Sequence, residues 1–227
     1  MFSFIQVIDA YLYHLIKEHQ MAVHQLCAVV GSSLFAGQFR CVSKMKFPAG
    51  NVWLCPVNTG AHWILVIINM LKKAVMLVDP LGQEGLYKRK IMRNWRNFLK
   101  TRGLDDSRVV WQCKTMQHNQ QLDSSSCGVL ILKFAEDFLL KEVITEVQTT
   151  QQAVSAARME IASSLLTYRK NAEDYCISCS MLQDDADRSM IEMVQCDLCS
   201  RWAHFECAEF DVSLTTYICK KCRHSSS

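Results

Sequence analysis

The sequence has no apolar run long enough to cross a membrane. Its longest run, Trp63 to Leu71, is strand-length, whereas a membrane-spanning helix needs about 18–20 apolar residues. Its start also lacks a basic segment followed by an apolar stretch and a small-residue cleavage site, so we expect no secretory signal. Charge of one sign does not dominate, because the formal net charge is +3. We therefore expect no membrane partner, and nucleic acid is not indicated.

What the sequence does contain is a large apolar fraction and many cysteines. Of its 227 residues, 50% are hydrophobic, which is enough for one to two domains with a sizeable core in the larger part. Twelve cysteines would suggest disulfides in a small secreted chain. Seven of the twelve lie in the last 52 residues at metal-ligand spacing. Together with the missing secretory signal, this favours a reducing compartment.

Apolar periodicity predicts the elements of the larger part. Residues 4–16 repeat apolar side chains at the spacing of one helical face. Short runs rich in Val, Ile and Trp between turn residues predict strands at 52–57, 63–70, 74–78 and 108–113. Further helices are expected at 86–102, 128–139 and about 145–170. The composition then changes sharply, which predicts a larger domain at 1–170 and a smaller one at 173–224.

Eight cysteine and histidine residues near the C-terminus form four pairs, each with two residues between its members. Such a pair can present both of its side chains to one tetrahedral zinc ion. Eight nitrogen and sulfur ligands would make two closed sites, which are structural rather than catalytic, and a domain of about 50 residues needs the metal to fold. The alternative is that these residues are unrelated or form disulfides. Four pairs with the same internal spacing argue against it. The eight are Cys176, Cys179, Cys196, Cys199, His204, Cys207, Cys219 and Cys222.

The order of these ligands, four cysteines, one histidine and three cysteines, resembles that of the PHD finger family over about residues 173–224. A RING finger is the rival, but a tryptophan, Trp202, two residues before the histidine favours PHD. The resemblance implies a small cross-brace finger with two structural zinc ions as its cofactors. It implies one site of Cys176, Cys179, His204 and Cys207 and another of Cys196, Cys199, Cys219 and Cys222.

PHD fingers commonly bind histone tails, and one branch binds methyl-lysine in an aromatic cage through cation–π attraction. Three positions, Tyr175, Met193 and Trp202, match the cage of that branch. The resemblance therefore implies a histone-tail partner, with methyl-lysine of histone H3 as the first choice. Simple packing of Tyr175 and Trp202, or binding of an unmethylated tail, is the alternative. The acidic residues that can contact the basic tail are Asp184, Asp185, Asp187 and Asp197.

In the larger part, Cys127 stands between a serine-rich turn and the helix expected at 128–139. The N-terminus of a helix carries partial positive charge and free N–H groups, which favour a thiolate. His62 precedes the expected central strand, and Asp79 ends the next strand. A short hairpin between these strands would bring His62 and Asp79 to one end of the sheet, as a base and its orienting carboxylate require. Taken alone, each of these residues can also be structural.

Three segments resemble the Ulp/SENP family of cysteine proteases: Ile8 to Leu12, Asn51 to Gly82, and Gln121 to Val129. They occur in the family's order and cover about residues 4–141. The resemblance implies an α+β fold of the papain-like or adenain-like cysteine protease type, with a mixed central sheet flanked by helices. It also implies a set of roles: His62 as general base, Asp79 as its orienter, Cys127 as nucleophile, Gln121 as oxyanion donor and Trp63 as the cover of a channel for a diglycine tail.

The implied function is a thiol isopeptidase or endopeptidase that cleaves after the diglycine of a ubiquitin-like modifier, with a SUMO-type modifier as the first choice. The modifier or its conjugates would be partners, and the nucleus the location, with the cytoplasm as the alternative. One departure is Ser126, which stands where the family usually has Asp. It leaves a second hypothesis open, a catalytically weak or inactive chromatin-binding adaptor of transposon origin. The basic helix face from Lys88 to Arg96 can be solvated or can dock an acidic partner.

Overall fold

A mixed sheet forms the centre of the larger of two units into which the chain separates, residues 1–165 and 166–227. This computed structural model describes residues 4–18, 23–39, 50–104, 108–167, 176–178 and 193–224. Within them, no helix combines the length and the apolar character that a membrane crossing requires.

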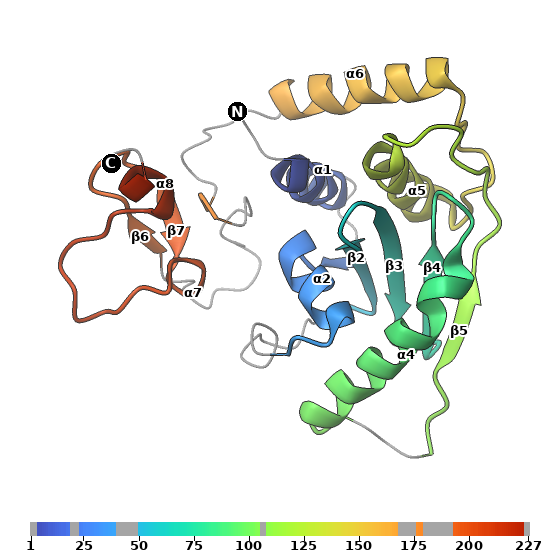
Figure 1. Ribbon diagram of the computed structural model, residues 1–227, viewed down its shortest axis with the longest axis horizontal. Helices are drawn as coiled ribbons and strands as arrows, with labels where there is room; N and C mark the ends of the chain where they lie inside the picture. The colour runs from blue at the N-terminus through green and yellow to red at the C-terminus, as the bar shows by residue number, and fades with distance from the viewer. Residues whose placement is uncertain are drawn as a thin grey trace. The chain divides into compact units, whose positions relative to one another are not determined.

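The five strands of the sheet follow one another in sequence order. The outer pairs, β1 with β2 and β4 with β5, are parallel, whereas β2, β3 and β4 pair antiparallel (Figure 1). The sheet is therefore mixed, as predicted. The strands are β1 Val23–Gln25, β2 Val52–Asn58, β3 Trp63–Asn69, β4 Ala74–Val78 and β5 Gln112–Thr115.

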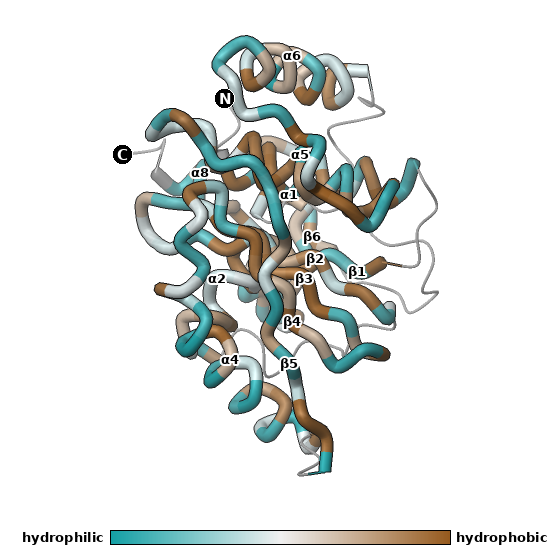
Figure 2. Tube along the Cα trace, turned by 90° about the vertical axis from the view of Figure 1, so that its right-hand side faces the viewer, coloured by the Kyte–Doolittle hydropathy of each residue, from teal (hydrophilic) through white to brown (hydrophobic). Residues whose placement is uncertain are grey.

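Helices cover both faces of this sheet (Figure 1). Along β3, Ile64, Val66 and Ile68 pack with α2 and α4, while the alternate side chains Leu65 and Ile67 pack with α1 and α5. Figure 2 shows hydrophobic colour along the central strands and along the adjoining α5. The helices of the larger unit are α1 Phe4–Glu18, α2 Ala28–Ala36, α4 Glu84–Thr101, α5 Cys127–Lys141 and α6 Gln151–Thr167.

The predicted central hairpins are confirmed, because β2, β3 and β4 lie within one residue of the expected bounds. The strand predicted at 108–113 lies later in the chain than expected, because β5 begins at Gln112. Its apolar residues precede the strand: Trp111 packs edge-on against Trp95 with ring centroids 5.0 Å apart, while Val110 is 77% exposed. The expected helix at 145–170 begins later than predicted, at Gln151.

Two elements of the larger unit, β1 and α2, were not predicted from the sequence. β1 has three residues, too few to show an alternating pattern. α2 carries a buried glycine, Gly31, where the helix lies directly against β2, and a Cβ atom added there would sit 2.8 Å from the main-chain oxygen of Pro56. Where two backbones pack this closely, the contact residue must be small. A helix with a glycine on its buried face shows little of the apolar periodicity by which a helix is predicted from sequence.

The smaller unit has a two-stranded antiparallel sheet of β6 Met193–Gln195 and β7 Trp202–His204, with short helices α7 Phe205–Ala208 and α8 Lys220–His224. Half of the six residues in its buried core are cysteines: Cys176, Ile177, Cys196, Ala203, Tyr217 and Cys219. The expected domain boundary near 170–174 falls outside the described residues and stays a prediction.

Candidate active site and metal centres

His62 and Asp79 are joined by a hydrogen bond at one end of the sheet. His62 Nε2 lies 2.6 Å from Asp79 Oδ1. His62 directly precedes β3, Asp79 directly follows β4, and the register pairs Leu65 with Val78, so the two side chains meet where the hairpin opens. Asp79 Oδ1 also accepts the N–H of Leu81 at 2.9 Å. With Nε2 held by the carboxylate, Nδ1 is the ring nitrogen of His62 that remains for proton exchange.

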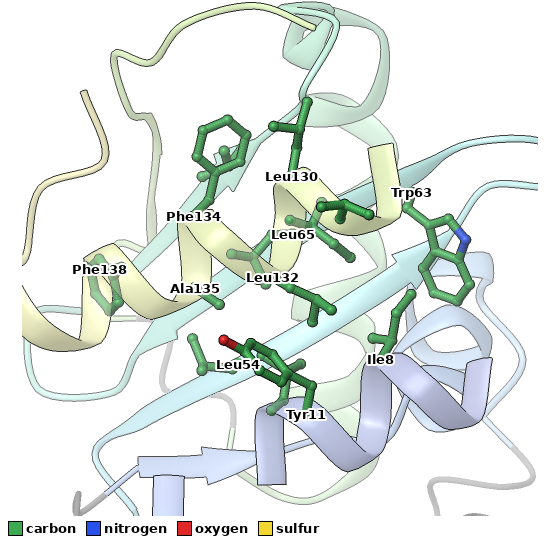
Figure 3. Close-up of a cluster of buried hydrophobic side chains, with 14 of the residues drawn as sticks. Ile8, Tyr11, Leu54, Trp63, Leu65, Leu130, Leu132, Phe134, Ala135 and Phe138 are labelled. Atoms are coloured by element: carbon green, nitrogen blue, oxygen red, sulfur yellow. The ribbon is translucent and has the colours of Figure 1, made fainter. Parts of the chain in front are cut away.

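Cys127 is the first residue of α5 and is 6% exposed. It belongs to the same cluster of buried side chains as Trp63, the residue after His62. Figure 3 shows Trp63 beside the first turn of α5 and Phe138 near the helix's other end. The start of α5 thus lies at the end of β3 where His62 stands. Backbone N–H groups of a first helical turn have no partner within the helix, which makes them available to an anion.

Gln121 is tied to the same end of the sheet through its backbone, because its N–H donates to the main-chain oxygen of Pro80 at 2.6 Å. Its buried side-chain amide donates from Nε2 to the main-chain oxygen of Asp123 at 2.6 Å and to Asp123 Oδ1 at 3.2 Å. The amide predicted to serve an oxyanion therefore has Asp123 as its partner here. Its role stays a prediction, and it requires the amide to turn away from Asp123.

Ser126, the departure from the family pattern, is fully buried in a polar network. Its hydroxyl donates to Asp123 Oδ2 and accepts from Arg158 Nη2 at 3.2 Å. Asp123 Oδ1 accepts the N–H groups of Ser125 and Ser126 at 2.9 and 2.8 Å. These bonds, the one from the Ser126 hydroxyl first, hold the pKa of Asp123 below its usual value. A carboxylate four residues before Cys127 thus organises the turn into α5.

Neither Asp123 nor Arg158 was predicted as a site residue. Asp-Ser-Ser-Ser is a turn-forming pattern and offered a signal for Asp123. No sequence signal marks Arg158, because α6 meets Ser126 only in the folded chain. A further residue, His118, was given no role from the sequence, yet its Nε2 lies 2.7 Å from the main-chain oxygen of Asp79.

In the smaller unit, seven of the eight predicted ligands fall into two clusters. One holds Cys196, Cys199, Cys219 and Cys222, and the other holds Cys176, His204 and Cys207, with the ligand atoms of each cluster within 4.8 Å of one another. The grouping follows the interleaved pairing that the resemblance implied. The eighth ligand, Cys179, lies outside the described residues.

The spacing of these atoms fits a metal better than a disulfide. The sulfurs of Cys199 and Cys219 are 3.9 Å apart, close to the roughly 3.8 Å that a tetrahedron with Zn–S bonds of about 2.3 Å requires. A disulfide bond is about 2.05 Å long. In the other cluster, Cys207 Sγ lies 3.6 Å from His204 Nδ1, which marks Nδ1 as the ligand atom of the ring. The four-cysteine cluster can therefore hold a metal ion.

Backbone N–H groups point at the sulfurs of both clusters. The N–H of Cys219 donates to Cys196 Sγ at 3.3 Å, and the N–H of His204 donates to Cys176 Sγ at 3.4 Å. Burial raises the pKa of the Cys196 thiol, but the backbone N–H groups of Cys219, Cys199 and Leu198 outweigh it and bring the pKa to about 6. Such bonds favour the thiolate, the form that binds a metal ion.

Two of the three predicted cage residues can be placed. Trp202 is 37% exposed on β7, and Met193 is half-buried on β6. The register pairs Trp202 with Gln195 and His204 with Met193, so Met193 and Trp202 are diagonal neighbours on one face of the hairpin. Tyr175 and the acidic residues at 184, 185 and 187 lie outside the described residues. Asp197 accepts the N–H of Tyr217 at 2.7 Å and therefore has a partner within the finger.

A family model describes the larger unit. The Ulp1 protease family, C-terminal catalytic domain, matches residues 7–171, which is most of the chain. The chain belongs to the Ulp1 protease family. This confirms the predicted resemblance for the larger unit, and the family match ends before the first cysteine pair of the smaller one.

Curated relatives of this Ulp1-family chain include sentrin-specific proteases. Sentrin-specific protease 2 of Homo sapiens is 25% identical over 156 residues, covering 63% of this chain and 26% of the relative. The protein of the same name from Pongo abelii is 26% identical over the same length and shares. The chain thus spans about a quarter of the length of the curated relatives it matches.

Solved structures confirm the fold. The SUMO protease Ulp1 with its catalytic cysteine oxidised to a sulfonic acid has a TM-score of 0.57 at 16% identity, covering 71% of this chain and 76% of that one. The Ulp1 protease domain in complex with Smt3, the yeast ortholog of SUMO, has the same TM-score at 16% identity, covering 70% and 75%. The larger unit has the Ulp1-like protease fold, a mixed sheet flanked by helices.

Proposed function

We propose that the protein is a thiol isopeptidase that cleaves after the diglycine end of a ubiquitin-like modifier, with a SUMO-type modifier as the first choice. The observation that carries this proposal is the hydrogen-bonded pair of His62 and the buried Asp79 at the sheet end where α5 begins with Cys127, in a chain of the Ulp1 family. The sentrin-specific proteases among its relatives and the Smt3-bound Ulp1 domain support the choice of modifier.

In this mechanism Asp79 accepts the Nε2 hydrogen of His62 and fixes the orientation of the ring. Nδ1 takes the proton of the Cys127 thiol, and the thiolate attacks the carbonyl carbon of the modifier's last glycine. His62 then returns the proton to the leaving lysine amine, which departs and leaves a thioester. A water molecule, deprotonated by His62, attacks the thioester and releases the modifier's carboxylate and the Cys127 thiol.

The negative oxygen that forms in both attacks needs donors. Free N–H groups at the start of α5 are one source, and the side-chain amide of Gln121 is the other once it turns from Asp123. Removing one such donor typically costs about 3–4 kcal/mol of transition-state stabilisation. Trp63, buried beside Ile8 at this end of the sheet (Figure 3), would cover the channel that admits only glycines.

Activity probes test the proposal directly. We expect the protein to form a covalent adduct with a SUMO-type modifier that ends in a vinyl sulfone or propargyl group. Cys127→Ala should abolish the adduct, whereas Cys113→Ala, which changes a half-buried cysteine of β5, should leave it intact. If no probe from a panel of ubiquitin-like modifiers gives an adduct that depends on Cys127, the protease proposal is wrong. The inactive-adaptor hypothesis would then stand.

We propose further that the smaller unit is a PHD-type finger with two structural zinc ions, held by the two clusters together with Cys179. Zinc would supply the folding free energy that so small a core cannot. The finger would bind a histone tail, methyl-lysine of histone H3 first, between Trp202, Met193 and Tyr175. With this function, the protein would act in the nucleus, at chromatin.

Peptide titration tests the finger separately from the protease. Methylated histone-tail peptides should bind the wild-type protein more tightly than unmethylated ones. Trp202→Ala should remove this difference, and Val212→Ala, at another exposed apolar residue of the same unit, should keep it. Equal affinity of the wild type and Trp202→Ala for every peptide would rule out the cage.

A further inference from the structure

A second histidine contacts the main chain of Asp79, the proposed orienter of His62. The ring of His118, whose side chain is 4% exposed, stands between the end of β4 and the first turn of α4. Its Nε2 lies 2.7 Å from the main-chain oxygen of Asp79, and its Nδ1 lies 2.8 Å from the main-chain oxygen of Met116. Both ring nitrogens therefore face a carbonyl oxygen.

These two contacts determine where the ring carries hydrogens. A main-chain carbonyl oxygen only accepts hydrogen bonds, so each ring nitrogen must donate. A neutral imidazole donates from one nitrogen and accepts at the other, and only the imidazolium donates from both. The neutral ring would leave one nitrogen lone pair against a carbonyl oxygen in a buried place, which is unfavourable. The geometry thus selects the positively charged form of His118.

The charged groups around His118 favour the same form. Glu84 approaches from α4, with Oε1 3.8 Å from His118 Nε2, and its side chain is 12% exposed. The same Oε1 accepts the backbone N–H of Asp79 at 3.2 Å. From α5 the ring meets the edge of the Phe134 ring, with centroids 5.0 Å apart. The carboxylate of Glu84 thus lies near His118, and a cation at His118 offsets its charge.

We propose that His118, as an imidazolium paired with Glu84, is a positioning residue for the Asp79–His62 pair. It donates to the main-chain oxygen of Asp79, which also accepts the N–H of Gly82 at 2.7 Å, and so fixes the turn that carries the carboxylate. The positive charge of His118 offsets the negative charge of Glu84. The His118–Glu84 pair is therefore neutral, and the thiolate of Cys127 forms without a further negative charge beside it. The inference rests on the proposed roles of Cys127 and His62.

Nitrogen NMR of the wild-type protein tests the protonation state without any substitution. The chain has seven histidines, and the signals of His118 in a protein with ¹⁵N-labelled histidine are those lost in His118→Gln. Near neutral pH, we expect both of its ring nitrogens to carry a hydrogen. One unprotonated ring nitrogen under these conditions would overturn the proposal.

The pH profile of Cys127 alkylation tests positioning without any modifier. Iodoacetamide modification of the Cys127 peptide is followed by mass spectrometry across pH in the full chain. In His118→Gln, Glu84 loses its counter-charge. The pH at which the alkylation rate of Cys127 rises should then be higher by about one pH unit. In the double variant His118→Gln with Glu84→Gln, the two positions again carry no net charge. Its alkylation profile should return towards that of the wild type. His14→Gln, at a histidine that pairs with Glu18 within α1, is the control and should change nothing.

An unchanged profile in His118→Gln, or a double variant at least as shifted as the single one, would overturn the charge argument, because a purely structural role predicts no recovery. The proposed function fails in a different way. If Cys127 is alkylated with the expected shifts but reacts with no modifier probe, the substrate proposal is wrong and the positioning role stands.

Discussion

Gln25 of β1 donates its side-chain amide to Asp9 of α1 twice, to the main-chain oxygen at 3.1 Å and to Oδ1 at 3.2 Å. Asp9 Oδ1 also accepts the N–H of Ala28 at 2.7 Å, which joins the start of α2 to the same carboxyl group. Asp9 is almost fully buried, and Oδ2 has no hydrogen-bond partner among the described residues. Three elements of the larger unit thus meet at one buried acid.

This acid should make the stability of the larger unit depend on pH. Burial raises the pKa of Asp9 to about 7, although the N–H of Ala28 and the amide of Gln25 act against it. The folded chain therefore keeps a proton that the unfolded chain releases near pH 3.8. Between these values the free energy of unfolding should fall as pH rises, by up to about 1.4 kcal/mol per pH unit, with little further loss above pH 7.

Urea unfolding at a series of pH values measures this slope. Asp9→Asn, which is uncharged at every pH, should flatten it, while Asp137→Asn, at a residue paired with Lys141 within α5, should retain it. The same slope in Asp9→Asn as in the wild type would exclude Asp9 as the cause.

Two glycines at the starts of helices should respond oppositely to alanine. Gly31→Ala in α2 places a methyl group 2.8 Å from the Pro56 oxygen, a backbone atom that cannot move aside cheaply, so we expect a loss of about 1–3 kcal/mol. Gly85→Ala in α4 meets nothing within 4 Å and should stabilise by roughly 0.4–1 kcal/mol. Thermal unfolding measures both, and a stabilising Gly31→Ala would contradict the close approach of α2 to β2.

The network at Ser126 can be tested by exchanging two residues. Ser126→Asp alone puts a buried carboxylate directly beside the exposed one of Asp123 and should cost about 1–3 kcal/mol of stability and slow Cys127 alkylation. Adding Asp123→Ser removes the repulsion and leaves one carboxylate near Arg158, so the double variant should recover a large part of both losses. Additive losses in the double variant would show that Asp123 and Ser126 act independently.

Metal removal should affect the two units differently. A strong chelator should unfold the smaller unit, in whose core three of six residues are cysteines, and leave the cooperative transition of the larger unit unchanged. Cys199→Ser should lower the measured zinc content from about two ions per chain to about one, whereas Cys55→Ser, in the core of the larger unit, should not alter it. Retention of the smaller unit's tertiary signals after complete metal removal would contradict a zinc-dependent fold.

The parts of the fold that could be predicted are those where local pattern and tertiary environment agree. β3 is buried along almost its whole length, and its continuous apolar run shows this directly. The meeting of His62 and Asp79 was predictable because a short hairpin leaves little freedom in register. β5 could not be placed, because an edge strand with mostly exposed side chains has no apolar pattern of its own. The roles of His118 and Arg158 depend on contacts across 39 and 32 positions of sequence, which periodicity does not report.

The bond from Arg158 to Ser126 has a consequence for where the protease unit ends. The three segments that carry the sequence resemblance end at Val129, and a shortened protein designed on them alone would keep His62, Asp79, Gln121 and Cys127. It would lose α6, and with it the guanidinium of Arg158 that donates to Ser126, the residue just before the proposed nucleophile Cys127. A truncated version can therefore contain every reactive group and still present its cysteine poorly. We therefore expect the smallest active fragment to include α6, the helix that contacts the turn before Cys127 and that also lies within the family match.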